Sequence, residues 1–405
     1  MKSFTNALVL AAGATLVVAG DRSDAKKSAQ EIVTDNGFLY EEHTVTTEDG
    51  YILQVWRIPG KSGEAPSAKP PVLMQHGILD SANCWLMNYA DVAPAFVAAE
   101  AGYDVWLGNT RGNTYSDANT DLDPNKDEKK FYDFSWDVMG RDVVAVQDYM
   151  LTQTGQEKIA YIGHSQGTTE MFYALAKDEQ SYADKMSLFV ALAPVTKISH
   201  NKDPLINFIT TFYNEVADIA SVLGIHQLLS RNWITSTACK VVCEPLPEFC
   251  ELLSKFFVSN ETDLDDDDRF AVYMGHEPNG ASVKAMLHYA QNMREDRFQE
   301  FSDDYTDFFN RKEKRTTDLI PLESISEVPI AIFTGTQDPL ADLTDSRWLR
   351  DTLSTDVLVH YEEVAAGHLT FMVGKDMTYF TEGVMGLLNQ YHPLPSAAQP
   401  EEFLQ

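Results

Sequence analysis

A single serine stands between two glycines in the stretch GHSQG, residues 163–167. Residues 158–162 before it are mostly bulky and apolar and predict a short buried strand, while 166–177 carry apolar side chains at helical spacing. A turn this tight favours Gly163 and Gly167, because larger side chains would collide as strand and helix close on each other. The pattern predicts a nucleophile elbow that presents the Ser165 hydroxyl above a sheet edge. The alternative interpretation is a serine that only caps the start of a helix.

A serine hydroxyl is a weak nucleophile near neutral pH, so it needs a base and a carboxylate that orients the base. In this kind of fold the partners follow in the order serine, acid, histidine. His368 comes after the last predicted strand, in a loop of small residues, and is the expected base. Asp338 follows the predicted strand at 329–334 and is the expected acid, with Asp342 as its rival. Histidines in less favourable positions are His200, His226, His276, His288, His360 and His392.

The negative oxygen of a tetrahedral intermediate must be held by backbone N–H groups. One donor is expected from the residue after the nucleophile, Gln166. The other is expected from Ile78 in the sequence MQHGILDS (74–81), because His76-Gly77 follows directly on the strand predicted at 71–75. Together these residues indicate acyl transfer from an ester to water, a reaction for which we expect no metal and no cofactor.

These side chains meet only if the elements that carry them end at one edge of a sheet. Apolar strands that alternate with helices, such as the one predicted at 136–151, favour an α/β fold. Its central sheet is expected to be mostly parallel, with helices on both faces. Two β-like runs around Glu48-Asp49-Gly50 predict an antiparallel hairpin at the sheet edge. The buried strands are predicted at 71–75, 102–107, 158–162, 186–192, 329–334 and 357–362.

The alternation of strands and helices stops in the middle of the chain. Between 196 and 325 strand signals vanish and helical stretches dominate, which predicts a helical cap with a lid over the carboxyl edge of the sheet. The core of the fold is then formed by 21–195 and 326–391. The polar residues 23–37 are expected to form a surface arm, and 392–405 a polar C-terminal tail.

The N-terminus has the form of a secretory signal. A lysine at position 2 precedes a short apolar stretch that ends in small residues, and cleavage is expected near residue 20. The stretch is short for a membrane span, and no other segment is apolar enough for one. We therefore expect residues 1–20 to be removed and the mature chain to be secreted, with the lumen of a lysosome or vacuole as the alternative.

Export from the cytosol would also allow the cysteines to form disulfides. Cys239, Cys243 and Cys250 cluster, which predicts a local disulfide that ends at Cys250 and starts at one of the other two. A metal site is not expected there, since no histidine or fourth cysteine stands at ligand spacing. Asn260 begins an N-x-T sequon and is a candidate for glycosylation. The acidic residues 263–268 are expected to form a solvated loop, because they lack the glycine and terminal glutamate of a calcium-binding loop.

The charge balance narrows the class of partner. Lys and Arg total 31 against 61 Asp and Glu, so the net charge is −30 at pH 7. A nucleic-acid partner is not expected, since binding phosphate requires a basic face. An anionic membrane surface would also repel the chain at neutral pH, and this repulsion fades toward the sequence pI of about 4.5.

The motifs together resemble the acid lipase family, which includes gastric lipase and lysosomal acid lipase. The resemblance covers about residues 37–388 and is carried by VTTEDGYILQVWRIP, LMQHGILDSANCW, AGYDVWLGNTRGNTYSD, FSWDVMGRD, YIGHSQGTTE, HEPNGASVKAMLHYAQ, VPIAIFTGTQDPLADL and GHLTF. It implies an α/β-hydrolase fold with a helical cap and a lid. Its nucleophile, acid, base and two oxyanion donors fall on Ser165, Asp338, His368, Ile78 and Gln166.

The sequence departs from the family in three respects, one of which is the spacing of its cysteines. The family usually has an aspartate two residues after its catalytic histidine, where this chain has Thr370. Residues 197–261, which would shape the lid and the acyl pocket, match poorly apart from their cysteines.

The resemblance implies hydrolysis of neutral lipid esters, either triacylglycerols or sterol esters, at acidic pH and at a lipid–water interface. An esterase for short, soluble esters would use the same triad, and preference for acyl-chain length separates the two. A non-catalytic secreted protein on a hydrolase scaffold is the alternative from another class. Such proteins typically lack a triad residue, whereas this sequence has all three.

Overall fold

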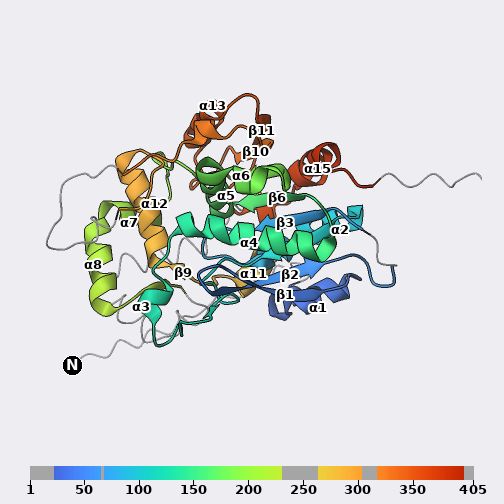
Figure 1. Ribbon diagram of the computed structural model, residues 1–405, viewed down its shortest axis with the longest axis horizontal. Coiled ribbons are helices and arrows are strands. Elements are labelled where there is room, and N and C mark those ends of the chain that lie inside the picture. Colours follow the sequence, from blue (N-terminus) through green and yellow to red (C-terminus); the bar gives the residue numbers. More distant parts are fainter. Residues whose placement is uncertain (1–21, 65–67, 230–262, 303–316, 396–405) are drawn as a thin grey trace, which may run out of the picture.

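A nine-stranded mixed sheet forms the centre of the fold (Figure 1). The computed structural model describes residues 22–64, 68–229, 263–302 and 317–395. Eight strands follow the order β1-β2-β4-β3-β6-β7-β10-β11, and β5 pairs with β2. The strands of this sheet are β1 (Glu41–Thr46), β2 (Tyr51–Ile58), β3 (Pro71–Gln75), β4 (Asp104–Gly108), β5 (Ala118–Asn119), β6 (Ile159–His164), β7 (Met186–Leu192), β10 (Ile330–Gly335) and β11 (Leu358–Val364).

The sheet is parallel from β4 to β11. Strand β3 pairs in parallel with β4 and β6, and β7 does so with β6 and β10, which in turn pairs with β11. Strands β1 and β2 form an antiparallel hairpin at the edge, and β2 also pairs antiparallel with β4. Every residue of β3, β4 and β6 is buried, as expected for strands covered on both faces. The predicted mostly parallel sheet with an edge hairpin is therefore confirmed.

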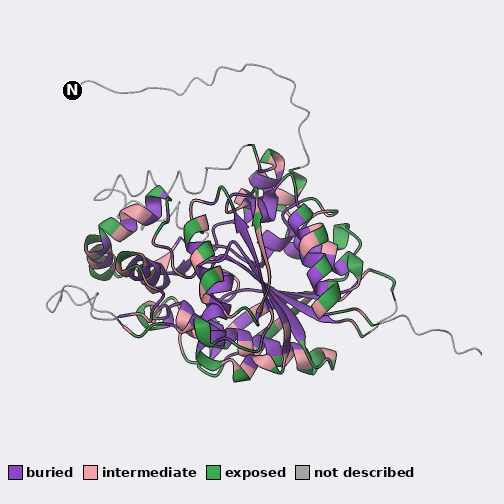
Figure 2. Ribbon diagram, turned by 90° about the horizontal axis from the view of Figure 1, so that it is seen from above, coloured by how far each residue is buried: buried purple, intermediate pink, exposed green. Residues whose placement is uncertain are grey.

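Helices cover both faces of this sheet, and their buried sides point toward it (Figure 2). Helices α4 and α5 pack on each other, while α2 packs on β4 and α15 on β7. The predicted helices at 136–151 and 166–177 correspond to α4 and α5, which extend a few residues further. The helices around the sheet are α2 (Pro94–Ala101), α3 (Glu128–Phe131), α4 (Trp136–Thr154), α5 (Gln166–Asp178), α6 (Gln180–Ala183), α13 (Leu343–Thr352), α14 (Thr370–Val373) and α15 (Met385–Tyr391), with short 3-10 or π turns η2 (Ala82–Leu86), η5 (Leu322–Ser324) and η6 (Tyr379–Val384).

A second group of helices lies beside the sheet, within the segment for which a cap is predicted (Figure 1). It contains α7 (Pro204–Thr211), α8 (Tyr213–Leu223) and α12 (Val283–Glu295), whereas α11 (Asp267–His276) of the same segment packs against the main core. Helix α12 packs on α7 and α8, around a small apolar core that includes Leu205, Tyr213 and Met286. Two short strands that the sequence did not predict, β8 (Gln227–Leu228) and β9 (Ala281–Ser282), pair there. The division at 196 and 325 stays a prediction, since its middle, 230–262, lies outside the described residues.

The expectation of a polar surface arm at 23–37 is wrong. The segment forms η1 (Ser23–Lys26) and α1 (Ala29–Asp35), and Ile32 and Val33 are fully buried in the main core. Ser28 starts α1 with a capping box, because its side chain and that of Glu31 each accept from the other's backbone N–H. The sequence did not predict this short helix because its apolar face has only three residues in a segment of polar composition.

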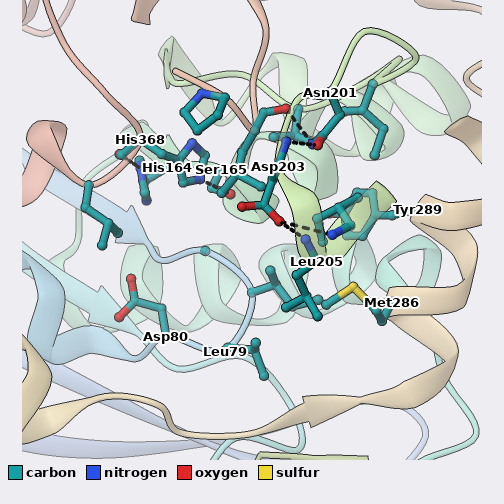
Figure 3. Close-up of a pocket in the computed structure, with 18 of the residues that line it drawn as sticks. Leu79, Asp80, His164, Ser165, Asn201, Asp203, Leu205, Met286, Tyr289 and His368 are labelled. Atoms are coloured by element: carbon teal, nitrogen blue, oxygen red, sulfur yellow. Dashed lines mark hydrogen bonds between the residues drawn. The ribbon is translucent and has the colours of Figure 1, made fainter. Parts of the chain in front are cut away.

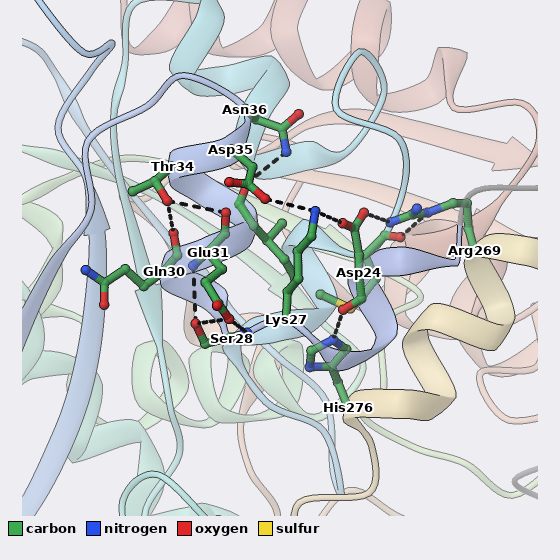
Figure 4. Close-up of polar contacts among 12 residues, drawn as sticks. Asp24, Lys27, Ser28, Gln30, Glu31, Thr34, Asp35, Asn36, Arg269 and His276 are labelled. Carbon is green, nitrogen blue, oxygen red and sulfur yellow. Dashed lines mark hydrogen bonds and ion pairs between the residues drawn. The ribbon is translucent and has the colours of Figure 1, made fainter.

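The same segment is tied to α11 across the surface of the core (Figure 4). The Asp24 carboxylate pairs with the buried Arg269 guanidinium at 3.1 Å, and His276 Nε2 donates to the Asp24 carbonyl at 2.9 Å. Helix α11 packs closely on η1, so that a Cβ on Gly275 would lie 2.7 Å from the Ala25 carbonyl oxygen. We call residues 23–35 the N-terminal strap.

The acidic run also differs from the expected solvated loop. Asp265 is buried and accepts a hydrogen bond from Thr370 Oγ1 at 2.6 Å. Asp266 caps α11 by accepting from two backbone N–H groups, and Asp267 and Asp268 lie in the first turn of that helix. Negative side chains at this end complement the helix dipole, which explains why the charges gather here.

Several predicted features lie outside the described residues. They are the signal peptide at 1–20, the cysteine cluster of Cys239, Cys243 and Cys250, the glycosylation candidate Asn260, and residues 396–405 of the predicted tail. The start of that tail packs on the core, where His392 is buried with Nδ1 2.8 Å from Ser187 Oγ.

Candidate active site

Strand β6 ends at His164 and α5 begins at Gln166, so Ser165 alone makes the turn between them. Its φ is +52° and its ψ −119°, a region that residues with a Cβ rarely adopt. The side chain makes no capping hydrogen bond with α5, which argues against the helix-cap interpretation. A Cβ on Gly167 would lie 2.4 Å from the Gln75 carbonyl oxygen, and one on Gly163 2.7 Å from the Gly167 backbone. Both glycines are therefore required by close backbone approach.

Three side chains that are distant in sequence form one hydrogen-bonded series at the carboxyl edge of the sheet. His368 Nε2 lies 2.9 Å from Ser165 Oγ, and His368 Nδ1 lies 2.8 Å from Asp338 Oδ2. The second Asp338 oxygen accepts from the Leu340 and Ala341 backbone N–H groups at 2.8 and 2.9 Å, which holds the carboxylate in place. With the proton on Nδ1, the imidazole donates to Asp338 and accepts from the serine hydroxyl, as general-base catalysis requires.

The rival residues have other partners. Asp342 caps α13 by accepting from the Thr344 N–H and pairs with Lys202. All ten histidines lie in the described part of the chain, and among these His368 is the one hydrogen-bonded to Ser165. The other candidates make different contacts: His200 with Asp345, His226 with Glu128 through its backbone, His276 with Asp24, His288 with Ser135, His360 with Glu362 and His392 with Ser187.

The two residues predicted to donate to the oxyanion lie next to the nucleophile, one in sequence and one in a neighbouring loop. Gln166 is the first residue of α5, where a backbone N–H has no acceptor within the helix. Ile78 follows Gly77, and a Cβ on Gly77 would lie 3.0 Å from Ser165 Cβ, so this loop lies directly against the nucleophile. Both Ile78 and Ser165 line the same cavity.

Two further histidines support the site, and neither role was predicted from the sequence. His164 Nε2 donates to the His368 carbonyl at 3.0 Å, and burial lowers the pKa of His164 to about 3. His76 Nε2 accepts from the Thr110 N–H at 3.0 Å while Nδ1 donates to the Gly77 carbonyl at 2.7 Å, and burial lowers the pKa of His76 to about 4. Both rings are therefore neutral and fix the loops of the base and of Ile78. Their positions next to the serine and to Gly77 were the only signals for them in the sequence.

The loop that carries His368 is anchored by Thr370, the residue that departs from the resemblance. Thr370 Oγ1 accepts from the Gly367 N–H at 2.9 Å and donates to Asp265 Oδ1. A buried carboxylate is thus present near this position, but it comes from the segment before α11 and reaches the loop through the threonine.

A cavity of about 290 Å³ opens at the serine (Figure 3). The close-up shows Ser165 and His368 on one side, with Leu205 of α7 and Met286 and Tyr289 of α12 facing them. Most of the lining is apolar. The polar exceptions include Asp203, whose carboxylate caps α7 and whose pKa burial raises, and Asp80, which follows Leu79 in the wall.

The sequence matches two family descriptions. Residues 29–89 match a "partial alpha/beta-hydrolase lipase region", and residues 70–375 match the "alpha/beta hydrolase fold".

Several known proteins are similar along most of their length. A gastric triacylglycerol lipase from Rattus norvegicus is 37% identical over 364 residues, 87% of this chain and 89% of that protein. The lipase lipl-1 of Caenorhabditis elegans is 34% identical, covering 92% and 94%. A lysosomal acid lipase/cholesteryl ester hydrolase from Macaca fascicularis is 33% identical, covering 91% and 92%. Among solved structures, DcsB in complex with its substrate analogue aligns with a TM-score of 0.51 at 13% identity, over 87% of this chain and 99% of that one, which is a likeness of fold.

Proposed function

Since this chain belongs to the acid lipase family of α/β-hydrolases, we propose that it hydrolyses the ester bonds of triacylglycerols or sterol esters through Ser165, His368 and Asp338. The observation that supports this most directly is the hydrogen-bonded series from Asp338 through His368 to Ser165 at the floor of an apolar cavity. We expect this chemistry to need no metal and no cofactor.

In the first half of the reaction His368 Nε2 takes the Ser165 proton while Oγ attacks the ester carbonyl carbon. Asp338 holds the imidazole in the productive tautomer and stabilises the imidazolium that forms. The Ile78 and Gln166 N–H groups bind the oxygen that becomes negative. As the tetrahedral intermediate collapses, the imidazolium gives its proton to the leaving alcohol and Ser165 retains the acyl group.

In the second half a water molecule replaces the alcohol. His368 removes a proton from this water, which attacks the acyl carbon, and the same oxyanion donors act again. The intermediate collapses to a free fatty acid, and the proton returns from His368 to Ser165. The catalyst is regenerated without any net consumption of a side chain.

The lining of the cavity favours a lipid over a short, soluble ester. Leu205, Ile206 and Met286 provide an apolar wall opposite the serine, which suits an acyl chain that leaves water. Residues 196–325 would then act as a cap over the sheet edge, with a lid that opens at a lipid–water interface. The protein meets this substrate outside the cytosol, after removal of residues 1–20. Among the described residues, no helix is both long and apolar enough to cross a bilayer.

The test is hydrolysis of a series of triacylglycerols from short to long acyl chains, at acidic and at neutral pH, with Ser165→Ala as the control. We expect long-chain hydrolysis by the parent chain and a loss of several orders of magnitude in kcat for the variant, which should remain folded. Release of fatty acid measures the activity, and circular dichroism checks the fold.

Other outcomes would redirect the proposal. Activity confined to short chains would identify an esterase with the same triad. Silence on every ester, from a folded protein, would favour the non-catalytic alternative.

A further inference from the structure

Two carboxyl side chains are buried together beside the loop that carries Ile78. Asp80 is 3% exposed and Glu277 6% exposed, and the two contact each other through their carboxyl groups. Asp80 lies in the cavity wall next to Leu79 (Figure 3), whereas Glu277 directly follows α11. Neither residue takes part in the reaction steps given above.

Hydrogen bonds connect Glu277 and its neighbour Asn279 to the loop at 77–81. Ser81 Oγ donates to Glu277 Oε1 at 2.6 Å, and Asn279 Nδ2 donates to the other carboxyl oxygen. The Asn279 backbone N–H donates to the Leu79 carbonyl at 2.9 Å, and Asp80 Oδ1 accepts from the Ser81 N–H. Leu79 has a φ of +64°, a conformation that needs such support.

Among the described residues, none of the groups that act most strongly on the two carboxylates carries a positive charge. The other titratable groups that act on Asp80 are Cys84 of η2 and Tyr273 of α11, and burial raises the pKa of both well above its usual value, so that both stay neutral. The basic residue Arg269, also on α11, contacts Asp24 and the Met87 carbonyl. His76, at the start of the loop, is neutral, as described above.

Two like charges in contact inside an apolar wall cannot both persist. Burial and the neighbouring Asp80 raise the pKa of Glu277 well above its usual value, and burial also raises that of Asp80. The arrangement therefore contains one proton that the two carboxyl groups hold between them, as in other coupled carboxyl pairs.

We propose that Asp80 and Glu277 are positioning residues, which by sharing one proton hold the loop at 77–81 where the Ile78 N–H meets the reacting carbonyl. This inference rests on the proposed function in one respect, the role of Ile78 as an oxyanion donor. The retention of a proton between Asp80 and Glu277 does not depend on that role.

The sign of the pH dependence follows from the pair. At low pH the shared proton is present and the two segments stay together. As pH rises through the raised pKa of the pair, the folded state must give up this proton, and repulsion between two buried carboxylates then separates the loop from residues 277–279. The contact between the loop and residues 277–279 is thus stabilised at acidic pH. This stabilisation is lost toward alkaline pH, and one oxyanion donor is lost with it.

The first test compares the pH dependence of kcat for the parent chain and Glu277→Gln, on a soluble ester. Glutamine keeps the shape and offers Asp80 a permanent N–H donor. We expect kcat of the parent to fall about 100-fold on the alkaline side as the pair ionises, the scale of losing one oxyanion donor. The variant should lose less than about threefold, because its amide does not titrate in this range.

Asp80→Asn is the second variant and should flatten the alkaline limb in the same way, which covers the case that Glu277→Gln folds poorly. Asp137→Asn is the matched control, since burial raises the pKa of Asp137 but this residue lies in the first turn of α4. Its profile should superimpose on that of the parent. The proposal would be overturned if the alkaline limbs of the kcat profiles of both Glu277→Gln and Asp80→Asn also superimposed on that of the parent.

The second test is independent of turnover. It measures amide hydrogen exchange in residues 77–81 of the Ser165→Ala variant. The exchange rate should rise with pH by more than the intrinsic, base-catalysed rate does, and adding Glu277→Gln should remove this excess. Such an excess supports the shared proton even if the chain hydrolyses no ester. A chain that hydrolyses no ester would overturn the proposed function but not the shared proton. Exchange that follows the intrinsic rate in both proteins would show that no proton holds the loop.

Discussion

Asp338 and Asp342 lie on one loop after β10, but their carboxylates do different work. Asp338 contacts His368, whereas Asp342 caps α13 and pairs with the exposed Lys202. Asp338→Asn should lower kcat by about 10³–10⁴-fold, because the imidazole loses the group that selects its tautomer. Asp342→Asn should leave kcat within about threefold and lower the free energy of unfolding by less than about 1 kcal/mol, because asparagine caps a helix as well as aspartate and the lost ion pair is with an exposed lysine. Kinetics and urea unfolding of both variants measure the two effects, and an inactive Asp342→Asn beside an active Asp338→Asn would reverse the assignment.

At the scale of single residues, the sequence predicted those groups whose position follows from a strand end. Ser165, Asp338 and His368 each come directly after an apolar run, so their shared edge could be inferred. Glu277 could not be paired with Asp80, because no local pattern connects the end of α11 to the loop after β3. The supporting role of His164 depends on contact with the His368 carbonyl, which is likewise a contact across the fold.

At the nucleophile elbow, helix α5 and strand β3 approach each other too closely to leave room for a side chain. Gly167→Ala should lower the free energy of unfolding by about 3 kcal/mol and also lower kcat, since the added Cβ meets the Gln75 carbonyl and displaces α5 or β3. Gly386→Ala is the matched control, because Gly386 is exposed in α15 with nothing within 4 Å of the added Cβ. That variant should gain about 0.5–1 kcal/mol from helix propensity. Urea unfolding measures both changes, and equal stability of the two variants would contradict this account of the elbow.

At the scale of elements, periodicity succeeded where an element is long or wholly apolar. Strands β3 and β7 match their predicted bounds, and the start of α4 was also predicted correctly. Helix α1 was missed because its buried face consists of Ala29, Ile32 and Val33 among polar neighbours. The acidic residues before and within α11 were also misjudged, since charge alone does not distinguish a helix start from a loop.

For the molecule as a whole, the N-terminal strap joins segments that are far apart in the chain. Asp24→Asn should lower the free energy of unfolding by about 2 kcal/mol, because Arg269 is buried and loses a charged partner. Asp35→Asn is the control, since Asp35 pairs with Lys27 near the surface and should contribute less than about 1 kcal/mol. Urea unfolding compares the two, and equal losses would mean that the strap contributes little through Asp24.

The architecture as a whole was predictable because alternation of apolar strands and helices leaves few ways to build a covered parallel sheet. The order of the strands and the docking of residues 23–35 on α11 were not predictable, because both depend on contacts between distant segments.

The strap also has a consequence for biosynthesis. Residues 23–26 leave the ribosome long before their partners in α11, which are synthesised well over two hundred positions later. Asp24 therefore stays without Arg269 during most of translation, and η1 docks only when the chain has reached α11. Until then the nascent chain carries an undocked segment that proteases can cleave, so docking of the strap marks a chain whose synthesis has passed His276.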